Sequence, residues 1–141
     1  MIFVTGGRAQ GKTAFARRLL QEAGRSREAV RAADGRDCPF SDIGACDILT
    51  HLEWLVRRAL QESMDTDALL DDLLSEDGPD IICADEIGLG IVPADREERL
   101  WRDEAGLAAQ KTAAAASEVY RIICGIPQCL KRKSGEEEPC L

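Results

Sequence analysis

The sequence predicts an α/β protein of the P-loop NTPase class, with a mostly parallel sheet flanked by helices. A short apolar segment, residues 1–5, leads into a glycine-rich stretch of the form G-x-x-x-x-G-K-[ST] and then into a helical pattern. Further apolar segments alternate with segments of helical periodicity along the chain. The 141 residues have room for one sizeable core, so we expect a single domain over residues 1–131.

The glycine-rich stretch is the most specific local motif. Its residues are Gly6, Gly7, Arg8, Ala9, Gln10, Gly11, Lys12 and Thr13. In this pattern, backbone N–H groups and the start of the following helix bind the phosphates of a nucleoside triphosphate. Lys12 is then expected to reach the β- and γ-phosphates and the Thr13 hydroxyl to ligate Mg²⁺, with ATP or GTP as the nucleotide. The alternative is a glycine-rich turn with a surface lysine.

The elements up to the middle of the chain follow from apolar spacing and turn residues. The helix after the loop is expected to end near Gly24, because glycine commonly follows the last helical turn. Residues 28–33 are a candidate second strand, followed by a turn at Asp34-Gly35. From Asp47, apolar residues fall on one arc at about 100° per residue, which predicts a helix to about residue 60.

The second half alternates in the same way. Asp65 or Thr66 is expected to cap a further helix, which ends before Asp77-Gly78-Pro79. Residues 80–84 have the continuous apolar character of a buried parallel strand. A glycine-containing loop is expected at residues 87–93 and a long helix at residues 94–117. A last core strand at residues 119–124 turns into a short edge, and the charged tail at residues 132–141 is expected to be disordered.

Two carboxylates directly follow the apolar strand at residues 80–84. In P-loop proteins such a strand delivers a carboxylate to the Mg²⁺ beside the triphosphate. Asp85 is expected to hold the metal through water, and Glu86 to orient or deprotonate the attacking hydroxyl. Asp47 is a rival metal ligand, because it also borders a short apolar patch, but a helix N-cap role explains it equally well.

The histidine and three arginines are further candidates. His51, the only histidine, lies at the polar edge of its predicted helix, where a nucleophilic or phosphate-contacting role competes with that of an ordinary, partly exposed side chain. Arg96, Arg99 and Arg102 share one face of the long helix. They either bind phosphate or a charged substrate, or form a solvated face paired with neighbouring acidic residues.

The composition excludes several classes of protein. The formal net charge of −8 argues against a nucleic-acid binder with a basic surface. The sequence has no apolar stretch long enough to span a membrane and no secretory signal. Its six cysteines form no C-x-x-C pair, and Cys124-x-x-x-x-Cys129 lacks the second pair that would complete a zinc site. We therefore expect a cytoplasmic protein with free thiols.

Two runs after the strand at residues 80–84 resemble those of a known family. They are Asp85-Glu86-Ile87-Gly88-x-Gly90-Ile91-Val92-Pro93 and Arg99-x-Trp101-Arg102-Asp103-x-x-Gly106-x-x-x-Gln110. They are similar to N-E-V-G-x-G-I-V-P and R-x-F-R-D-x-x-G-x-x-N-Q of the adenosylcobinamide kinase/adenosylcobinamide-phosphate guanylyltransferase family of cobalamin biosynthesis. The loop at residues 6–13 and the stretch from Val119 to Lys131 also resemble this family.

The resemblance implies a RecA-like P-loop fold, often as a trimer. It implies phosphorylation of the aminopropanol hydroxyl of adenosylcobinamide by a nucleoside triphosphate, followed by transfer of GMP from GTP through a guanylylated histidine. Glu86 matches the family's Glu, and Asp85 replaces its Asn. Asp47-Ile-Leu-Thr50 is similar to the family's D-C-L-T, which would make Asp47 the metal-binding carboxylate. Matches in the second run make Arg99, Arg102 and Gln110 candidate substrate contacts, with a corrinoid as the partner.

One family segment has no counterpart here. The family carries its GMP-accepting histidine in an H-x-x-x-R setting before the D-C-L-T element, whereas His51 follows that element. The sequence therefore favours the kinase step over guanylyl transfer. Two alternatives stay open: a non-catalytic relative that binds nucleotide or corrinoid, and a P-loop kinase or NTPase that acts on another small alcohol.

Overall fold

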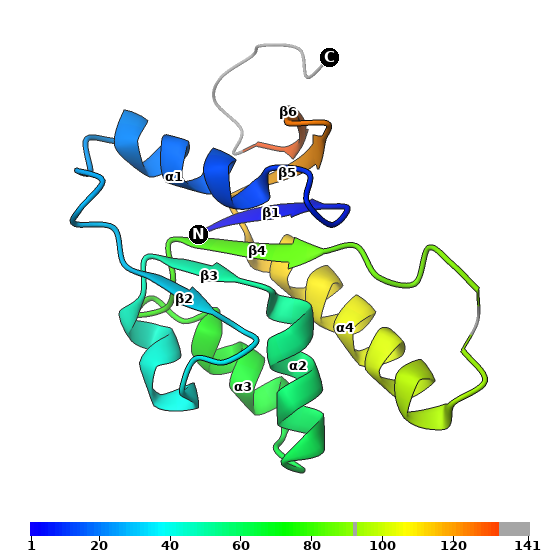
Figure 1. Cartoon of the computed structure of the whole chain (residues 1–141). Helices are drawn as coiled ribbons and strands as arrows, with labels where there is room; N and C mark the ends of the chain where they lie inside the picture. The colour runs from blue at the N-terminus through cyan, green and yellow to red at the C-terminus, as the bar shows by residue number, and fades with distance from the viewer. Residues whose placement is uncertain (92, 133–141) are drawn as a thin grey trace.

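The computed structural model describes residues 1–91 and 93–132, which form one six-stranded sheet with helices on both faces (Figure 1). The strand order is β2-β3-β4-β1-β5-β6. Neighbouring strands from β2 to β5 are parallel, and β6 is antiparallel to β5. The strands are β1 (Ile2–Gly6), β2 (Ala32–Asp34), β3 (Ile48–Thr50), β4 (Ile81–Asp85), β5 (Glu118–Ile123) and β6 (Ile126–Lys131).

Helix α1 covers one face of the sheet, and α2, α3 and α4 cover the other (Figure 1). Alternation along β1 supplies both layers: Val4 packs with Phe15 of α1, whereas Phe3 packs with the opposite helices. The helices are α1 (Lys12–Glu22), α2 (Leu52–Gln61), α3 (Thr66–Leu73) and α4 (Arg96–Ala115), with a 3₁₀ helix, η1 (Phe40–Ala45), before β3. The expected α/β fold with a mostly parallel sheet is confirmed.

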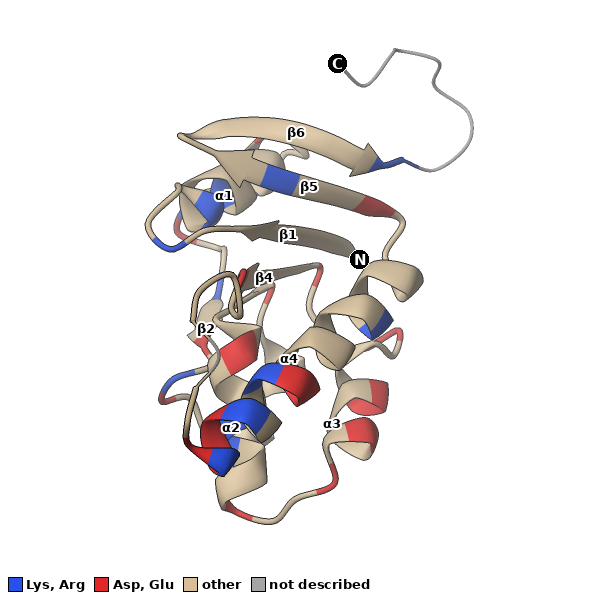
Figure 2. Cartoon of the chain, turned by 90° about the vertical axis from the view of Figure 1, so that its right-hand side faces the viewer, with Lys and Arg blue, Asp and Glu red and all other residues tan. Residues whose placement is uncertain are grey.

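Ion pairs connect helices α3 and α4 at the surface of the protein. All charged residues of α3 are acidic, whereas α4 carries both acidic and basic residues (Figure 2). The ammonium group of Lys111 on α4 lies 3.2 Å from a carboxylate oxygen of Asp67 and 2.8 Å from one of Asp71, both on α3. No helix in the described part of the chain is long and apolar enough to cross a membrane.

Several element boundaries differ from the sequence predictions. The helix predicted from Asp47 begins only at Leu52, because residues 48–50 form β3 instead. All three residues of β3 are buried. A buried run this short shows no hydrophobic periodicity that could distinguish a strand from a helix in the sequence. The second strand is also shorter and later than residues 28–33. Apart from Arg132, the tail predicted to be disordered lies outside the described residues.

The parallel arrangement brings the carboxyl ends of β1 to β5 to one edge of the sheet (Figure 1). The glycine-rich loop follows β1, His51 follows β3, and Asp85 ends β4. Ligands of open parallel sheets bind beyond this edge. This edge is therefore the first place to search for a functional site.

Candidate functional site

The glycine-rich loop connects β1 directly to α1, as the motif requires. Gly6 adopts φ +147°, and a Cβ there would lie 2.5 Å from the carbonyl oxygen of Ile122, so only glycine fits against β5. The Lys12 ammonium group donates to the carbonyl oxygens of Gly7 at 2.7 Å and Gly6 at 3.2 Å, so the lysine lies across the loop. Thr13 is exposed in the first turn of α1.

Asp85 lies beside the loop lysine. In the pairing of β1 with β4, Gly6 is opposite Asp85, and the Lys12 ammonium lies 2.6 Å from an Asp85 carboxylate oxygen. Both side chains are nearly buried, so the ion pair has little screening by water. The arrangement places one carboxylate and one ammonium group where a P-loop protein binds phosphate and metal.

Glu86 is held by an arginine from the other side of β1. Both carboxylate oxygens accept hydrogen bonds from the Arg121 guanidinium on β5, at 2.8 and 2.7 Å. This pairing raises the pKa of Arg121. The Glu86 backbone N–H donates to the carbonyl oxygen of Gly6, which ends β1. Strand β1 lies between β4 and β5, so the ion pair between Glu86 and Arg121 crosses it. Both carboxylate oxygens are thus bound to Arg121, and the role expected of Glu86, to orient or deprotonate the attacking hydroxyl, stays a prediction.

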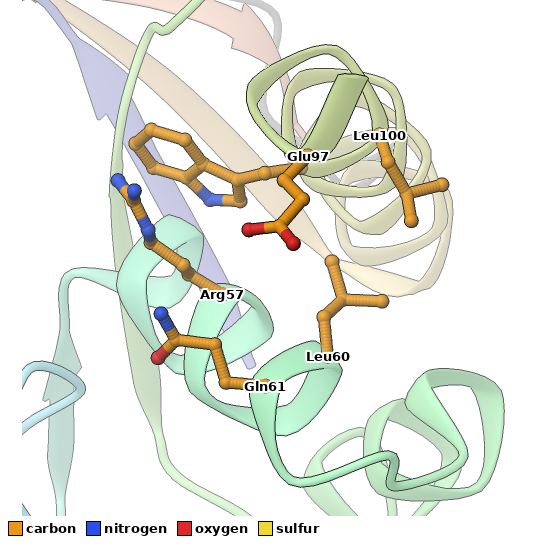
Figure 3. A pocket seen from close by; sticks show the side chains of 6 residues that line it. Arg57, Leu60, Gln61, Glu97 and Leu100 are labelled. Atoms are coloured by element: carbon orange, nitrogen blue, oxygen red, sulfur yellow. The ribbon is translucent and has the colours of Figure 1, made fainter. Parts of the chain in front are cut away.

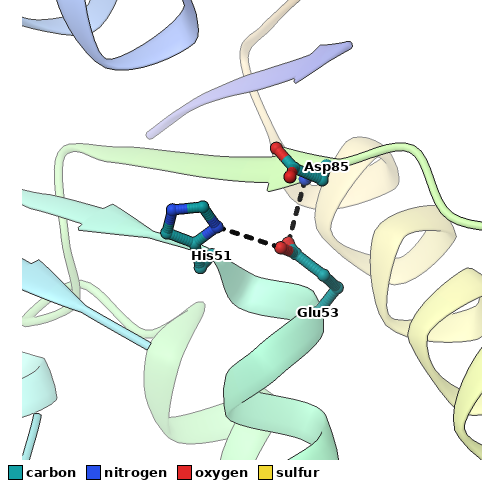
Figure 4. Close-up of side chains that lie close together, drawn as sticks. All are labelled: His51, Glu53 and Asp85. Carbon is teal, nitrogen blue, oxygen red and sulfur yellow. Dashed lines mark hydrogen bonds and ion pairs between the residues drawn. The ribbon is translucent and has the colours of Figure 1, made fainter. Parts of the chain in front are cut away.

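His51, Glu53 and Asp85 lie together at the ends of β3 and β4 (Figure 4). His51 Nδ1 lies 3.1 Å from Oε1 of Glu53, and Oε2 of Glu53 accepts the Asp85 backbone N–H at 2.9 Å. One ligand atom from each residue lies within 4.8 Å of the others. Glu53 is 3% exposed, and this burial raises the pKa of its carboxyl group above the ordinary value.

Glu53 was missed by sequence reasoning. A signal was present, because Glu53 adjoins the apolar arc of the helix that contains Leu52, Leu55 and Val56. A carboxylate at such a position needs polar partners when the helix packs. The backbone N–H of Asp85 is the partner, but it comes from another strand and is not visible in the local pattern.

A cavity of about 250 Å³ opens at this edge. Its walls combine residues of the loop, the strand ends and the helical layer: Arg8, Arg36, His51, Glu53, Trp54, Asp85, Glu86, Ile87 and Trp101. This cavity is thus lined both by Arg8 of the phosphate-binding loop and by His51, which follows β3. This geometry allows one molecule to contact both groups.

The aromatic wall of the cavity is fixed by an arginine. The Arg57 guanidinium carbon lies 4.4 Å from the Trp101 ring centroid and 5.0 Å from that of Trp54. Trp101 also donates its indole N–H to the Glu53 carbonyl at 2.6 Å, which joins α4 to the start of α2. A second cavity of about 370 Å³, which Trp101 also lines, lies between α2 and α4 (Figure 3).

Asp47 lies at the opposite end of the sheet from the loop. It precedes β3, where its carboxylate accepts the Arg31 backbone N–H at 2.7 Å and pairs with Arg25 at 2.7 Å. These bonds hold the pKa of Asp47 below its ordinary value. The expectation that Asp47 ligates the nucleotide-bound metal is not met, because strand β3 separates it from the edge that carries Lys12. It is not a helix N-cap either, since His51 occupies that position.

The arginines predicted as substrate contacts on α4 make hydrogen bonds within the chain, and their contact with a substrate stays a prediction. Arg99 donates to the carbonyl oxygens of Pro93 and Ala94, and Arg102 donates to that of Ile91. Both arginines therefore join the loop after β4 to α4. Gln110 is exposed further along the helix, and the structure does not bring it to the cavity that contains His51.

The fold and the loop define the class of the protein. A six-stranded, mostly parallel sheet carries a G-x-x-x-x-G-K-T loop between its first strand and helix, and the loop lysine is paired with a carboxylate of the adjacent strand. These features are those of a P-loop NTPase with a RecA-like sheet.

The particular family follows from comparison with known proteins. The model of the cobinamide kinase / cobinamide phosphate guanyltransferase family matches residues 46–130, and the chain belongs to this family. The matched region contains His51, Glu53 and Asp85 but not the loop at residues 6–13. The family resemblance inferred from the sequence is confirmed.

Two curated relatives are similar to part of the chain. Both are named bifunctional adenosylcobalamin biosynthesis protein CobU, one from Salmonella typhimurium strain LT2 and one from Escherichia coli strain K12. Each is 46% identical over 46 residues, which is 33% of this chain and 25% of the relative. The similar stretch thus spans a quarter of the length of these relatives.

Proposed function

We propose that this protein acts in cobalamin biosynthesis or salvage as a kinase that transfers the γ-phosphoryl group of ATP or GTP to the aminopropanol hydroxyl of adenosylcobinamide. The observation that carries the proposal is that one cavity is lined by Arg8 of the phosphate-binding loop and also by His51 and Glu86. The family match and the two CobU relatives support the choice of a cobinamide as the substrate.

The loop residues fit a bound nucleotide and its Mg²⁺. The backbone N–H groups between Gly6 and Thr13 would hold phosphate oxygens, and the buried Lys12 would contact the β- and γ-phosphates. The exposed Thr13 hydroxyl and the Asp85 carboxylate supply the oxygen donors that Mg²⁺ prefers. When bound, Mg²⁺ neutralises negative charge on the phosphates.

The cavity size bears on how the acceptor binds. A volume of about 250 Å³ is below the roughly 300–1,000 Å³ typical of pockets that enclose a drug-sized ligand. We therefore propose that only the hydroxyl-bearing arm of the corrinoid enters, while its macrocycle stays outside. Arg8 and Arg36 line the cavity and would attract the phosphate of nucleotide or product.

Incubation with adenosylcobinamide, Mg²⁺ and either ATP or GTP tests the proposal. Mass spectrometry is expected to show a corrinoid heavier by one phosphate group. Lys12→Ala removes the cation that contacts the transferred group and should abolish the product. If neither triphosphate gives the phosphate ester with the unmodified chain, the proposed kinase activity is wrong.

Guanylyl transfer is a second candidate, because the family name includes it and because a histidine lines the cavity. Treatment with GTP labelled at the α-phosphate would attach GMP covalently to His51 if this activity exists. Absence of a label, together with formation of the phosphate ester, supports a kinase without the transferase step.

A homotrimer is proposed from the family resemblance alone. Light scattering of the purified protein would give a mass three times that of the 15.4 kDa chain. A monomeric mass at working concentrations would contradict it.

A further inference from the structure

The cavity beside the loop contains three carboxylates, and each has partners. Asp85 is paired with the Lys12 ammonium, and Glu86 is bound by the Arg121 guanidinium. Glu53 is buried, with one oxygen on the Asp85 N–H and the other on the His51 ring. None of the three is therefore available as an unpaired base for a substrate.

His51 differs from these carboxylates because one ring nitrogen remains available. Nδ1 lies against Glu53, whereas Nε2 has no hydrogen-bond partner among the described residues. In Figure 4 the second ring nitrogen lies on the side of the imidazole away from Glu53. The His51 side chain is 25% exposed and lines the cavity, so a substrate hydroxyl can reach it.

The backbone holds His51 in an unusual conformation. His51 has φ +57° and ψ +51°, a left-handed conformation that few non-glycine residues adopt. A Cβ on Gly35 would lie 2.3 Å from the His51 carbonyl oxygen, so this glycine lets the turn after β2 approach closely. The same carbonyl accepts the first backbone bonds of α2. Such strain persists only where the surrounding structure enforces it.

Glu53 determines which ring nitrogen carries the proton. Nδ1 lies 3.1 Å from Oε1 of Glu53, and an ionised carboxylate can only accept a hydrogen bond, so Nδ1 is the nitrogen that would carry the proton of a neutral imidazole. The lone pair of the ring would then lie on Nε2. The Asp85 N–H and the Trp101 indole, which donates to the Glu53 carbonyl, fix the position of Glu53. A carboxylate in this position orients an imidazole base and stabilises the cation formed on protonation.

We propose that His51 Nε2 is the general base that accepts the proton of the substrate hydroxyl, and that Glu53 is its positioning residue. This inference rests on the proposed kinase function. The hydroxyl oxygen forms a bond to the γ-phosphorus, and the bond from that phosphorus to the β,γ-bridging oxygen breaks. The nucleoside diphosphate leaves with the electron pair, and the hydroxyl proton moves to Nε2.

Charged groups from several elements surround this imidazole. Glu53 lies on α2, and Asp85 ends β4. Asp34 ends β2, and the pKa of its carboxyl lies below the ordinary value, chiefly because of its hydrogen bond with Arg36 and in smaller part because of its electrostatic interaction with His51. Arg8 and Glu86 line the same cavity. Any pH dependence of the base reflects all of these neighbours.

A measurement that needs no activity tests the positioning. Because His51 is the only histidine, untagged protein with ¹⁵N-labelled histidine gives one pair of ring-nitrogen signals. About two pH units above the ordinary histidine pKa, long-range ¹H–¹⁵N spectra should show protonated Nδ1 and unprotonated Nε2. Glu53→Gln should move the proton to Nε2, because the amide donates where the carboxylate accepted. A wild-type Nε2–H tautomer, or no change in Glu53→Gln, would overturn the role of Glu53.

Kinetics test the proton transfer. His51→Gln and Glu53→Gln should each lower kcat for the phosphate ester by about 10²-fold or more, with the KM for nucleotide unchanged. The acidic limb of the pH–rate profile should disappear in His51→Gln. Glu62→Gln makes the same chemical change as Glu53→Gln at the exposed far end of α2 and should leave kcat unchanged.

The outcomes separate this inference from the proposed function. If wild-type protein forms no ester, the kinase proposal fails, whereas the ring-nitrogen spectra still decide whether Glu53 sets the His51 tautomer. If wild type forms ester and His51→Gln retains its rate and acidic limb, His51 is not the base. Covalent attachment of GMP to His51 would also overturn the base role, in favour of a nucleophile.

Discussion

Asp47 shows how a residue can match a motif and still lie at the wrong end of its strand. Its identity and its neighbours fit the family's D-C-L-T element, but β3 begins after it. The carboxylate therefore reaches Arg25 and the Arg31 backbone at the amino edge of the sheet. The sequence predicted a helix from Asp47 and no strand at residues 48–50, so it gave no means of assigning Asp47 to one edge of the sheet.

Asp47→Asn is expected to lower the free energy of unfolding by about 1 kcal/mol at neutral pH, because it removes the charge that pairs with Arg25. The folded pKa of Asp47 is below its ordinary value, so this stabilisation is present above the ordinary value and is lost as pH falls through the folded pKa. Urea denaturation at neutral and acidic pH checks it. Ester formation should be unchanged, and a loss of Mg²⁺-dependent activity would restore Asp47 as a metal ligand.

Glu53→Gln is expected to leave the protein at least as stable as wild type near neutral pH. Burial raises the pKa of Glu53 in the folded protein. The buried, protonated side chain therefore adds fully to the free energy of unfolding below the ordinary Glu pKa, and this contribution is lost as the pH rises through the folded pKa. The amide carries no charge and avoids this loss. In thermal denaturation, the higher stability of Glu53→Gln relative to wild type should disappear at low pH. A variant that is less stable than wild type at every pH would contradict the burial argument.

The structural elements were predicted with uneven success. The strand–loop–helix unit around Lys12 was predicted because glycine spacing and the flanking periodicities agree. The β5–β6 hairpin was predicted only as a strand that turns into a short edge, since its pairing involves no long-range motif. The approach of Glu53 to Asp85 was not predictable, because it depends on how α2 packs against β4.

Gly35→Ala tests the contact between the turn after β2 and His51. A Cβ there would meet the His51 carbonyl at 2.3 Å, so the backbone must move and displace the imidazole. We expect a fall in kcat for the ester with nucleotide affinity retained, since the loop at residues 6–13 is untouched. Gly44→Ala is the matched control, because its Cβ would meet its nearest neighbour at 3.9 Å. Equal kinetics for the two variants would show that the contact is not required.

Gly6→Ala tests the packing of the loop against β5. Its Cβ would lie 2.5 Å from the Ile122 carbonyl oxygen, and its φ of +147° disfavours a side chain. Titration with a fluorescent nucleotide should show lost affinity, and the melting temperature should fall. Gly7→Ala is the comparison, because its Cβ would meet only the Gln10 side chain, at 3.4 Å. Unimpaired binding by Gly6→Ala would remove the close approach to β5 as the reason for this glycine.

For the molecule as a whole, the parallel sheet explains why residues distant in sequence meet. The loop, His51 and Asp85 follow three different strands, and their carboxyl ends share one edge. The net charge of −8 makes local cations important for binding an anionic nucleotide, and Lys12, Arg8 and Arg36 lie at this edge. The fold class was predictable from the alternation of strands and helices and from the glycine-rich motif, whereas the partners of each side chain required the three-dimensional structure.

Transfer of radioactivity from γ-³²P-labelled ATP or GTP to adenosylcobinamide is the most direct test of phosphoryl transfer at this edge. With the unmodified protein and Mg²⁺, the corrinoid fraction is expected to carry the label, whereas α-labelled nucleotide should leave it unlabelled. Lys12→Ala should remove the γ-label from the product. A corrinoid that stays unlabelled with both γ-labelled nucleotides, despite measurable nucleotide binding, would contradict the kinase function.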